Sequence, residues 1–179
     1  MEDEALVKQI LAGDDQALRM LYERYFQPIF QYAFIQTGNY HDAEEITQDI
    51  FSKMARNLHT FKQDSSFKTW LYSIGRNVVI DHHRKQKRHK QVIPVPGSDM
   101  EAIKRESVQT AKTNKRLDEV LAYLSQLPDD YRTVIQLRFI DNFTLQETAH
   151  IMKKTLLSVK SLQHRAKKQL TAAVEKGGL

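Results

Sequence analysis

The sequence contains no cysteine and little glycine or proline, with six and four respectively among 179 residues. The absence of cysteine excludes disulfide bonds and thiolate metal sites, which suits the cytoplasm. No apolar run is long enough to span a bilayer, and the N-terminus, MEDEALVKQ, is acidic and therefore unlike a signal peptide. We therefore expect a soluble, cytoplasmic protein.

The sequence also lacks the motifs of an enzyme. It has no glycine-rich phosphate loop, no nucleophile elbow and no nucleophile paired with a base. The triplet Asp81-His82-His83 matches the DHH motif of a phosphoesterase family, but adjacent residues on the predicted helix diverge by about 100°, which is poor geometry for joint chelation. We expect no catalytic residue, cofactor, metal site or small-molecule substrate. A metal-dependent phosphoesterase using Asp81 and His82 is the most distant alternative.

Sustained two-residue alternation, the pattern of a half-buried strand, is also missing. Apolar residues recur instead at spacings of three and four, which predicts an all-α fold. A short helix over residues 4–12 should end at Gly13, and Asp14 or Asp15 can cap the next helix. That second helix should end at Gly38, and Pro28 within it should cause a kink or a break.

A third helix is predicted over residues 43–57, with Asp42 placed as its cap. One face of this helix is apolar, with Phe51 next to it, and the other face is acidic. The apolar residues are Ile46, Ile50 and Met54; the polar ones are Glu44, Glu45, Gln48 and Asp49.

The stretch 61–90 changes character along its length. A polar loop, DSS, can cap a helix with an apolar stripe formed by Phe67, Trp70, Leu71, Ile74 and Val78. At about 100° per residue, the line from Trp70 continues through Asn77, Asp81, Arg84 and Arg88. Two interpretations remain open. The last turns either overrun the core as a solvated end, or lie on a polyanion while the first turns pack in the core.

The pattern lapses over residues 91–113, which hold two prolines, a glycine and no apolar period. We interpret this segment as a flexible linker between two small helical domains, residues 1–90 and 114–179.

The second domain is predicted to contain a helix-turn-helix. Pro128 is placed at the first position of a helix, Asn142 breaks it, and Thr144 with Glu147 fits a capping box. After a tight connection at 153–155, the last helix has one apolar stripe and a basic polar face. A helical hairpin without DNA-binding function has the same periodicity. The stripe is Val159, Leu162, Ala166 and Leu170; the other faces hold Lys160, Ser161, His164, Arg165, Lys167 and Lys168.

Charge is distributed unevenly along the chain. Residues 1–50 carry ten acidic and three basic side chains, whereas residues 51–92 carry two acidic and ten basic ones. This asymmetry suggests two partners, the basic block binding a nucleic acid. Aromatic rings next to cations suit a single strand, because unstacked bases stack on the rings while phosphates follow the charges. The rings are Phe61, Phe67, Trp70 and Tyr72. Phe67 and Trp70 are expected to lie in the core, which leaves the loop between Phe61 and Phe67 as the candidate for base contacts.

Three motifs, in order and over nearly the full length, resemble a sigma factor of bacterial RNA polymerase of the small, two-domain extracytoplasmic-function (ECF) type. Residues 42–51, DAEEITQDIF, resemble the family's polymerase-binding helix. Residues 67–74, FKTWLYSI, with the following Arg76-Asn77, Asp81 and Arg84, resemble its promoter-melting and minus-10-reading helix. The fourth region, which reads the minus-35 element, is matched by Leu127-Pro128, Tyr131-Arg132, Glu147, Ala149, Val159-Lys160-Ser161 and His164-Arg165-Ala166.

This resemblance implies three sets of binding residues. The set for core polymerase is Glu44, Glu45, Gln48, Asp49 and Phe51. The set for the minus-10 element is Phe61, Lys62, Lys68, Trp70, Arg76, Asn77, Arg84, Lys85 and Arg88. The set for the minus-35 element is Thr155, Ser158, Lys160, Ser161, His164, Arg165 and Lys168.

The implied partners are core RNA polymerase, through the clamp of its largest subunit and the flap of its second-largest subunit, and promoter DNA, both duplex and single-stranded. An anti-sigma factor, either free or membrane-bound, is also implied. The runner-up interpretation is a free-standing helix-turn-helix regulator that binds duplex DNA without polymerase.

Four positions depart from the family's pattern. The family usually has glycine where Lys153 stands and a small residue or glycine where Leu157 stands. It commonly has a basic residue at Leu162 and an apolar one at Gln163. A rotation of the last helix that exposed Gln163 would change which residues reach DNA.

Overall fold

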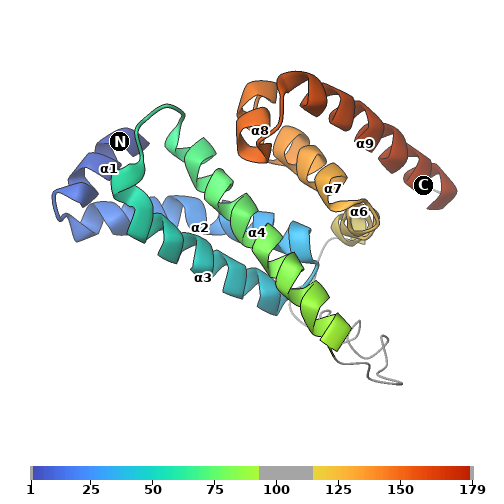
Figure 1. Cartoon of the computed structure of the whole chain (residues 1–179), viewed down its shortest axis with the longest axis horizontal. Coiled ribbons are helices and arrows are strands. Elements are labelled where there is room, and N and C mark those ends of the chain that lie inside the picture. The colour runs from blue at the N-terminus through green and yellow to red at the C-terminus, as the bar shows by residue number, and fades with distance from the viewer. Residues whose placement is uncertain (1, 93–114, 178–179) are drawn as a thin grey trace.

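The structure, a computed structural model, describes residues 2–92 and 115–177 and contains only helices over those ranges (Figure 1). The predicted linker therefore lies almost entirely outside the described residues. None of the helices described is both long and apolar enough to cross a membrane. The helices are α1 (Asp3–Leu11), α2 (Asp15–Thr37), α3 (Tyr40–Asn57), η1 (Leu58–Thr60), α4 (Phe67–Val92), α6 (Lys115–Ser125), α7 (Asp129–Ile135), η2 (Gln136–Ile140), α8 (Leu145–Met152) and α9 (Leu156–Gly177).

The first helices begin and end close to the predicted positions. The Asp14 side chain caps α2 by accepting from the backbone N–H groups of Gln16 and Ala17. Gly13 and Gly38 have φ of +94° and +67°, values that glycine adopts without a Cβ clash. The predicted break at Pro28 is wrong, because α2 runs through it without interruption.

The predicted cap of α3 is also wrong. Asn39, not Asp42, caps the helix, and its Oδ1 accepts from the Asp42 backbone N–H at 2.9 Å. The Asp42 carboxylate instead contacts α4, where Gln86 donates to it at 2.8 Å and His82 Nε2 lies 3.4 Å away. Asp42 therefore holds the start of α3 against α4.

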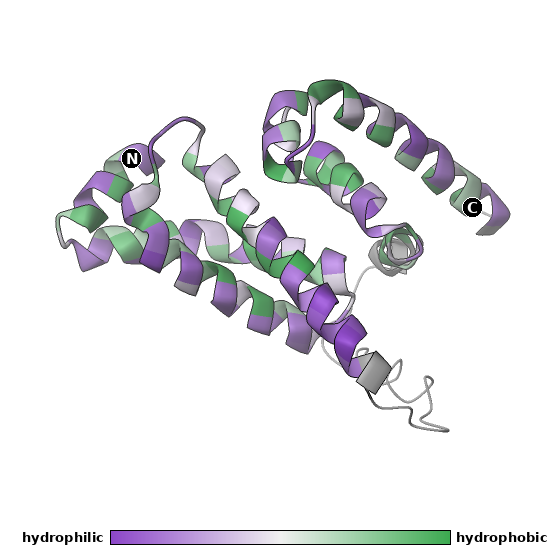
Figure 2. Ribbon diagram, in the orientation of Figure 1, coloured by the Kyte–Doolittle hydropathy of each residue, from purple (hydrophilic) through white to green (hydrophobic). Residues whose placement is uncertain are grey.

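In the N-terminal domain, α4 packs against α2 and α3. Its Phe67, Leu71 and Val78 are buried, as the periodicity predicted. Gly75 allows this close approach, since a Cβ there would lie 3.3 Å from Ile50 Cδ1. The C-terminal turns of the helix, which extend past α3, are predominantly hydrophilic (Figure 2).

In the C-terminal domain, α7 continues into the π-helical turn η2. The wider turn is closed by a bond from Asp141 N–H to the Gln136 carbonyl. It shifts the helix face, so that Leu137 is buried and Phe139 is 44% exposed.

The helix-turn-helix is formed by α8 and α9. The Thr144–Glu147 capping box is present at the start of α8, and Lys153 ends the helix with φ of +52°. Val159, Leu162 and Ala166 of α9 are buried. Gln163 is half-buried, and its Oε1 accepts from Arg138 Nε at 2.9 Å. The predicted rotation of α9 is therefore confirmed.

The two domains lie against each other, with α4 packed on α8 and α2 packed on α6 and α7 (Figure 1). This arrangement decides which of the predicted site residues are accessible.

Candidate polymerase and promoter interfaces

The exposed face of α3 is acidic. Glu44, Glu45, Gln48 and Asp49 are all exposed, because the opposite face is buried in the core. Phe51 is different: its ring is only 8% exposed and packs on Tyr22, with the ring centroids 4.6 Å apart. Phe51 thus supports the helix from inside in this arrangement, and its assignment to the polymerase set stays a prediction.

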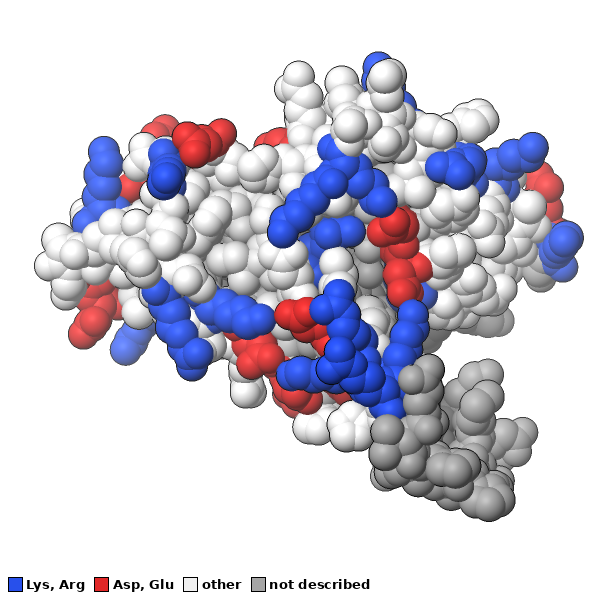
Figure 3. Space-filling view, in the orientation of Figure 1, with Lys and Arg blue, Asp and Glu red and all other residues white. Residues whose placement is uncertain are grey.

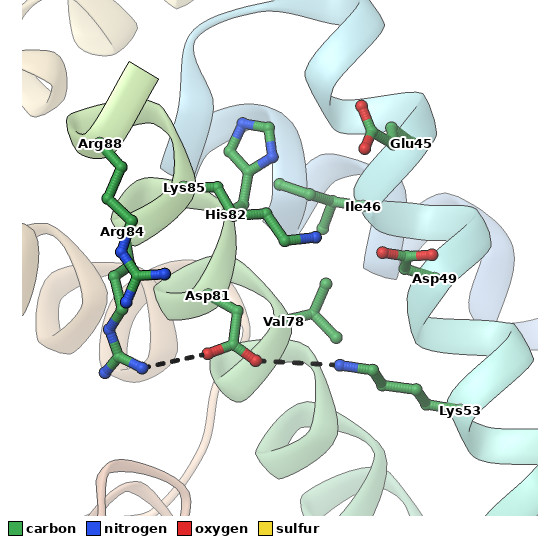
Figure 4. A pocket seen from close by; sticks show the side chains of 10 residues that line it. All are labelled: Glu45, Ile46, Asp49, Lys53, Val78, Asp81, His82, Arg84, Lys85 and Arg88. Atoms are coloured by element: carbon green, nitrogen blue, oxygen red, sulfur yellow. Dashed lines mark ion pairs between the residues drawn. The ribbon is translucent and has the colours of Figure 1, made fainter. Parts of the chain in front are cut away.

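The C-terminal half of α4 carries a basic cluster of exposed side chains. Arg84, Lys85 and Arg88 lie with Asp81 along a groove between α3 and α4 (Figure 4). Acidic side chains lie next to this cluster on the surface (Figure 3). Asp81 pairs with Arg84 at 3.6 Å and with Lys53 at 4.0 Å, and all three side chains are well solvated. Such surface pairs contribute little to stability, so Arg84 is available to a ligand.

The loop before α4 has a buried aromatic core. The Phe61 ring is only 9% exposed and lies edge-on to Phe67 and tilted against Trp70. In this arrangement the ring offers no open face on which a base could stack, and its assignment as a DNA contact stays a prediction. Trp70 is half-buried, and Lys62, which follows Phe61 in the chain, is exposed. The predicted DSS cap is confirmed, because Ser66 Oγ accepts from the Thr69 N–H at 3.1 Å.

Two residues of the minus-10 set are covered by the C-terminal domain. Lys68 Nζ donates to the Asp141 carbonyl at 2.7 Å and lies 4.4 Å from the centre of the Phe143 ring. The Arg76 side chain is only 14% exposed and pairs with Asp130 at 3.6 Å. In this arrangement neither side chain is free for DNA.

The contact between the domains, which we call the domain seam, contains a buried polar network. Arg132 Nη1 donates to the Gln36 carbonyl at 2.8 Å, and Gln36 Nε2 donates to Gln136 Oε1 at 2.6 Å. Arg132 also binds three carbonyls at and after the end of α6, so one guanidinium joins helix ends from both domains. The seam comprises Gln36, Lys68, Tyr72, Arg76, Asp130, Arg132, Thr133, Gln136, Asp141 and Phe143.

Asp141 is the titratable centre of the seam. Tyr72 Oη donates to its Oδ1 at 3.3 Å, and the second carboxylate oxygen is buried without a partner among the described residues. Burial raises the pKa of this carboxyl to about 7, against smaller effects of the Tyr72 hydrogen bond and the Lys68 charge. Burial and the nearby carboxylate also raise the pKa of the Tyr72 phenol.

Only a weak signal of this network is present in the sequence. Gln36 and Gln136 are polar residues on otherwise buried helix faces. Such residues indicate a partner but not its identity, because their contacts lie about a hundred residues away in the chain.

The polar face of α9 is open. Lys160, Ser161, His164, Arg165 and Lys168 are exposed, as are Thr155 and Ser158 at the start of the helix. Thr155 Oγ1 caps α9 by accepting from the Ser158 N–H at 3.2 Å. An exposed basic face on the second helix of a helix-turn-helix is the arrangement that enters a major groove.

No metal centre is apparent over the described ranges, which hold no cluster of three or more His, Asp or Glu side chains. Asp81 and His82 contact different partners, Lys53 and Arg84 for the first and Asp42 for the second.

Two family models match the chain and divide it as the fold does. Sigma-70 region 2 matches residues 21–89, and Sigma-70 region 4 matches residues 123–172. The ECF RNA polymerase sigma factor SigX of Bacillus subtilis (strain 168) is 32% identical, over 90% of this chain and 85% of that protein. The chain belongs to the ECF sigma factors. A second relative, the ECF RNA polymerase sigma-E factor of Escherichia coli (strain K12), is 28% identical over 98% of this chain and 95% of its own length.

Two solved structures have the same fold as this sigma factor, each with a TM-score of 0.73. One is RpoE in complex with the anti-sigma factor NepR from Bartonella quintana, at 21% identity over 88% of this chain and 96% of that one. The other is CnrH in complex with the cytosolic domain of CnrY, at 24% identity over 97% of both chains.

As a member of this family, the protein is an initiation factor that directs RNA polymerase to specific promoters. The domain seam is thus a contact between region 2 and region 4, formed across α4–α8 and α2–α7.

Proposed function

We propose that this sigma factor docks on core polymerase through the acidic face of α3 and binds promoter DNA through α4 and α9. The observation that carries this proposal is the separation of charge on the surface. Glu45 and Asp49 are exposed on one helix, while the basic residues of α4 and α9 are exposed on others. Basic side chains of the polymerase clamp can meet the first surface, and phosphates can meet the other two.

On α4, Asn77, Arg84, Lys85 and Arg88 form the accessible part of the minus-10 surface. Lys68 and Arg76 join it only after the domain seam opens, since both are held by region 4 in this arrangement. We therefore expect the seam to separate when the factor binds polymerase. Since polymerase and the chromosome are its targets, we expect the protein to act in the cytoplasm.

An anti-sigma factor is the expected negative regulator. Two structures of the same fold contain such a partner or the cytosolic domain of a second protein. A ligand that binds the closed arrangement better than the open one would stabilise the seam and keep Lys68 and Arg76 covered.

Reconstituted transcription with purified core polymerase tests the proposal. Start sites mapped on genomic DNA should depend on both the protein and core. Sequence-specific DNA binding that needs no polymerase, with no effect on initiation, would favour a free-standing helix-turn-helix regulator instead.

Charge reversal tests the docking surface directly. Glu45→Lys with Asp49→Lys should weaken core binding by tenfold or more at low salt and leave the melting temperature unchanged, because both side chains are exposed. The matched control is Glu23→Lys, an exposed acid on α2. Equal core affinity for the double variant and the control would exclude α3 from the interface.

A further inference from the structure

Leu157 is the most exposed of the large apolar side chains in the described part of the chain, at 76%. It lies in the first turn of α9 and takes no part in the core, which α9 contacts through Val159, Leu162 and Ala166. Exposing a leucine side chain to water is unfavourable, and the fold of this domain does not require it. A contact made outside the chain would account for it.

The position of Leu157 on the helix indicates what that contact is. Residues four apart share a helix face, so Leu157, Ser161 and Arg165 form one exposed row. Lys160 and His164, at three and seven residues beyond Leu157, flank this row. Leu157 is therefore the N-terminal member of the face that we assign to DNA reading.

The surroundings of Leu157 are polar and cationic. It lines a shallow hollow with Lys154, Ser158, Ser161 and Arg165, and with the buried Leu162 at its base. The preceding residue, Leu156, is the other exposed apolar side chain of this turn. A protein-docking surface would be a contiguous apolar patch, whereas hydroxyls and cations around one apolar side chain suit a nucleic acid groove.

In a major groove, one base offers an apolar group. Thymine presents its C5 methyl there, and apolar side chains recognise it by contact. The N-terminal residues of a recognition helix are those that reach base edges. We propose that Leu157 is a specificity-determining residue that reads one thymine of the upstream promoter element through its C5 methyl group. This rests on the proposed function, in which α9 enters the major groove.

Replacing thymine by deoxyuridine removes the methyl group and leaves every hydrogen-bonding group in place. Binding of holoenzyme, wild type or Leu157→Ala, is measured on promoters carrying deoxyuridine at one upstream position at a time. At one position the substitution should weaken wild-type binding by about three- to fivefold, the effect of one lost methyl contact. Leu157→Ala should bind the two promoters equally well.

Two further variants separate the outcomes. Both Leu156→Ala and Arg165→Ala should retain the deoxyuridine effect. Arg165→Ala should in addition lose discrimination at a different base. The proposal is overturned if every position affects wild type and Leu157→Ala equally. It is also overturned if Leu157→Ala weakens binding to core polymerase without DNA, since the side chain would then contact protein. If wild-type holoenzyme shows no preference for any upstream sequence, the proposed function of α9 itself fails.

Discussion

Neutralising Asp141 should stabilise the closed arrangement of the two domains above neutral pH. Asp141 is 9% exposed, and part of its cover comes from Tyr72 and Lys68 of region 2. Burial raises its pKa from 3.8 to about 7, so its ionised form is disfavoured while the seam is closed. When the domains separate, the carboxylate regains water and a pKa near its ordinary value.

The raised pKa determines the direction in which the stability of the seam changes with pH. The contribution of Asp141 to seam stability is fully present below about pH 4 and is lost as the pH rises through 7. At about 1.4 kcal/mol per pKa unit, the loss is at most about 4 kcal/mol. It is smaller where region 4 itself covers the carboxyl. Asp141→Asn removes this loss but weakens the hydrogen bond from Tyr72 by about 1 kcal/mol. We expect a net stabilisation of about 2–3 kcal/mol at pH 8 and none below pH 4.

The assay uses the absence of native cysteine. Ala55→Cys and Ala172→Cys, both at exposed positions in different domains, accept a donor and an acceptor dye. Energy transfer during urea titration then gives the free energy of domain separation at each pH. Burial lowers the pKa of His83, which stands near Asp129 and Arg132. Protonation of His83 therefore destabilises the seam as the pH falls below about 6.5, whereas ionisation of Asp141 destabilises it as the pH rises. All variants should carry His83→Gln, so that only Asp141 contributes to the pH dependence.

Tyr72→Phe provides a second test. It removes the donor to the carboxylate, so the pKa of Asp141 should rise further and the transition should move to higher pH. If Asp141→Asn keeps the wild-type pH dependence, then Asp141 is not the titrating group of the seam and the reasoning is wrong.

Three further changes test the DNA surfaces and the turn. Arg84→Ala with Arg88→Ala should weaken binding to all promoters and reduce the slope of log K against log salt by about 1.5 to 2; an unchanged slope would show that this end of α4 is only solvated. Arg165→Ala should relax selection at one upstream base by about 1–3 kcal/mol, whereas Lys168→Ala should weaken all promoters alike; selection from a randomised upstream element should return different consensus sequences for wild type and Arg165→Ala. Lys153→Gly should raise the free energy of unfolding by about 0.5–1 kcal/mol in urea titrations, because Lys153 has a left-handed backbone, and a lower value would contradict this.

The elements that depend on neighbouring residues could be predicted from the sequence. The Thr144–Glu147 capping box, the Asp14 cap and the buried stripe of α9 each need only a few consecutive residues, and all three are present. The cap of α3 could not be decided in this way, because Asn39 and Asp42 both suit a cap. The Asp42 carboxylate contacts His82 and Gln86, which are about forty residues away in the chain, and Asn39 is the residue that caps the helix.

The exposure of the candidate side chains was predicted well where it follows from helix periodicity and poorly where it follows from packing. Glu45 and Arg165 lie on polar faces and are exposed. Phe61 was expected to contact DNA, but a ring in a loop next to a core is buried when its neighbours are aromatic. The cover over Arg76 comes from Asp130, more than fifty residues away, and no local pattern reports such a contact.

The domain seam also bears on how the cell can control this factor. A partner that binds only the separated domains has its apparent affinity lowered by the fraction that is open, so a ratio of about 100 closed to 1 open weakens it about 100-fold. Because both halves of the seam belong to one chain, this ratio does not change with the amount of protein. A separate inhibitor protein is fully occupied when the factor is produced in excess over it, and the surplus factor is then free. A contact within the chain is present in every molecule of the factor. Restraint from the seam would therefore persist at every expression level, and only a ligand or a change in pH that acts on the contact itself would release it.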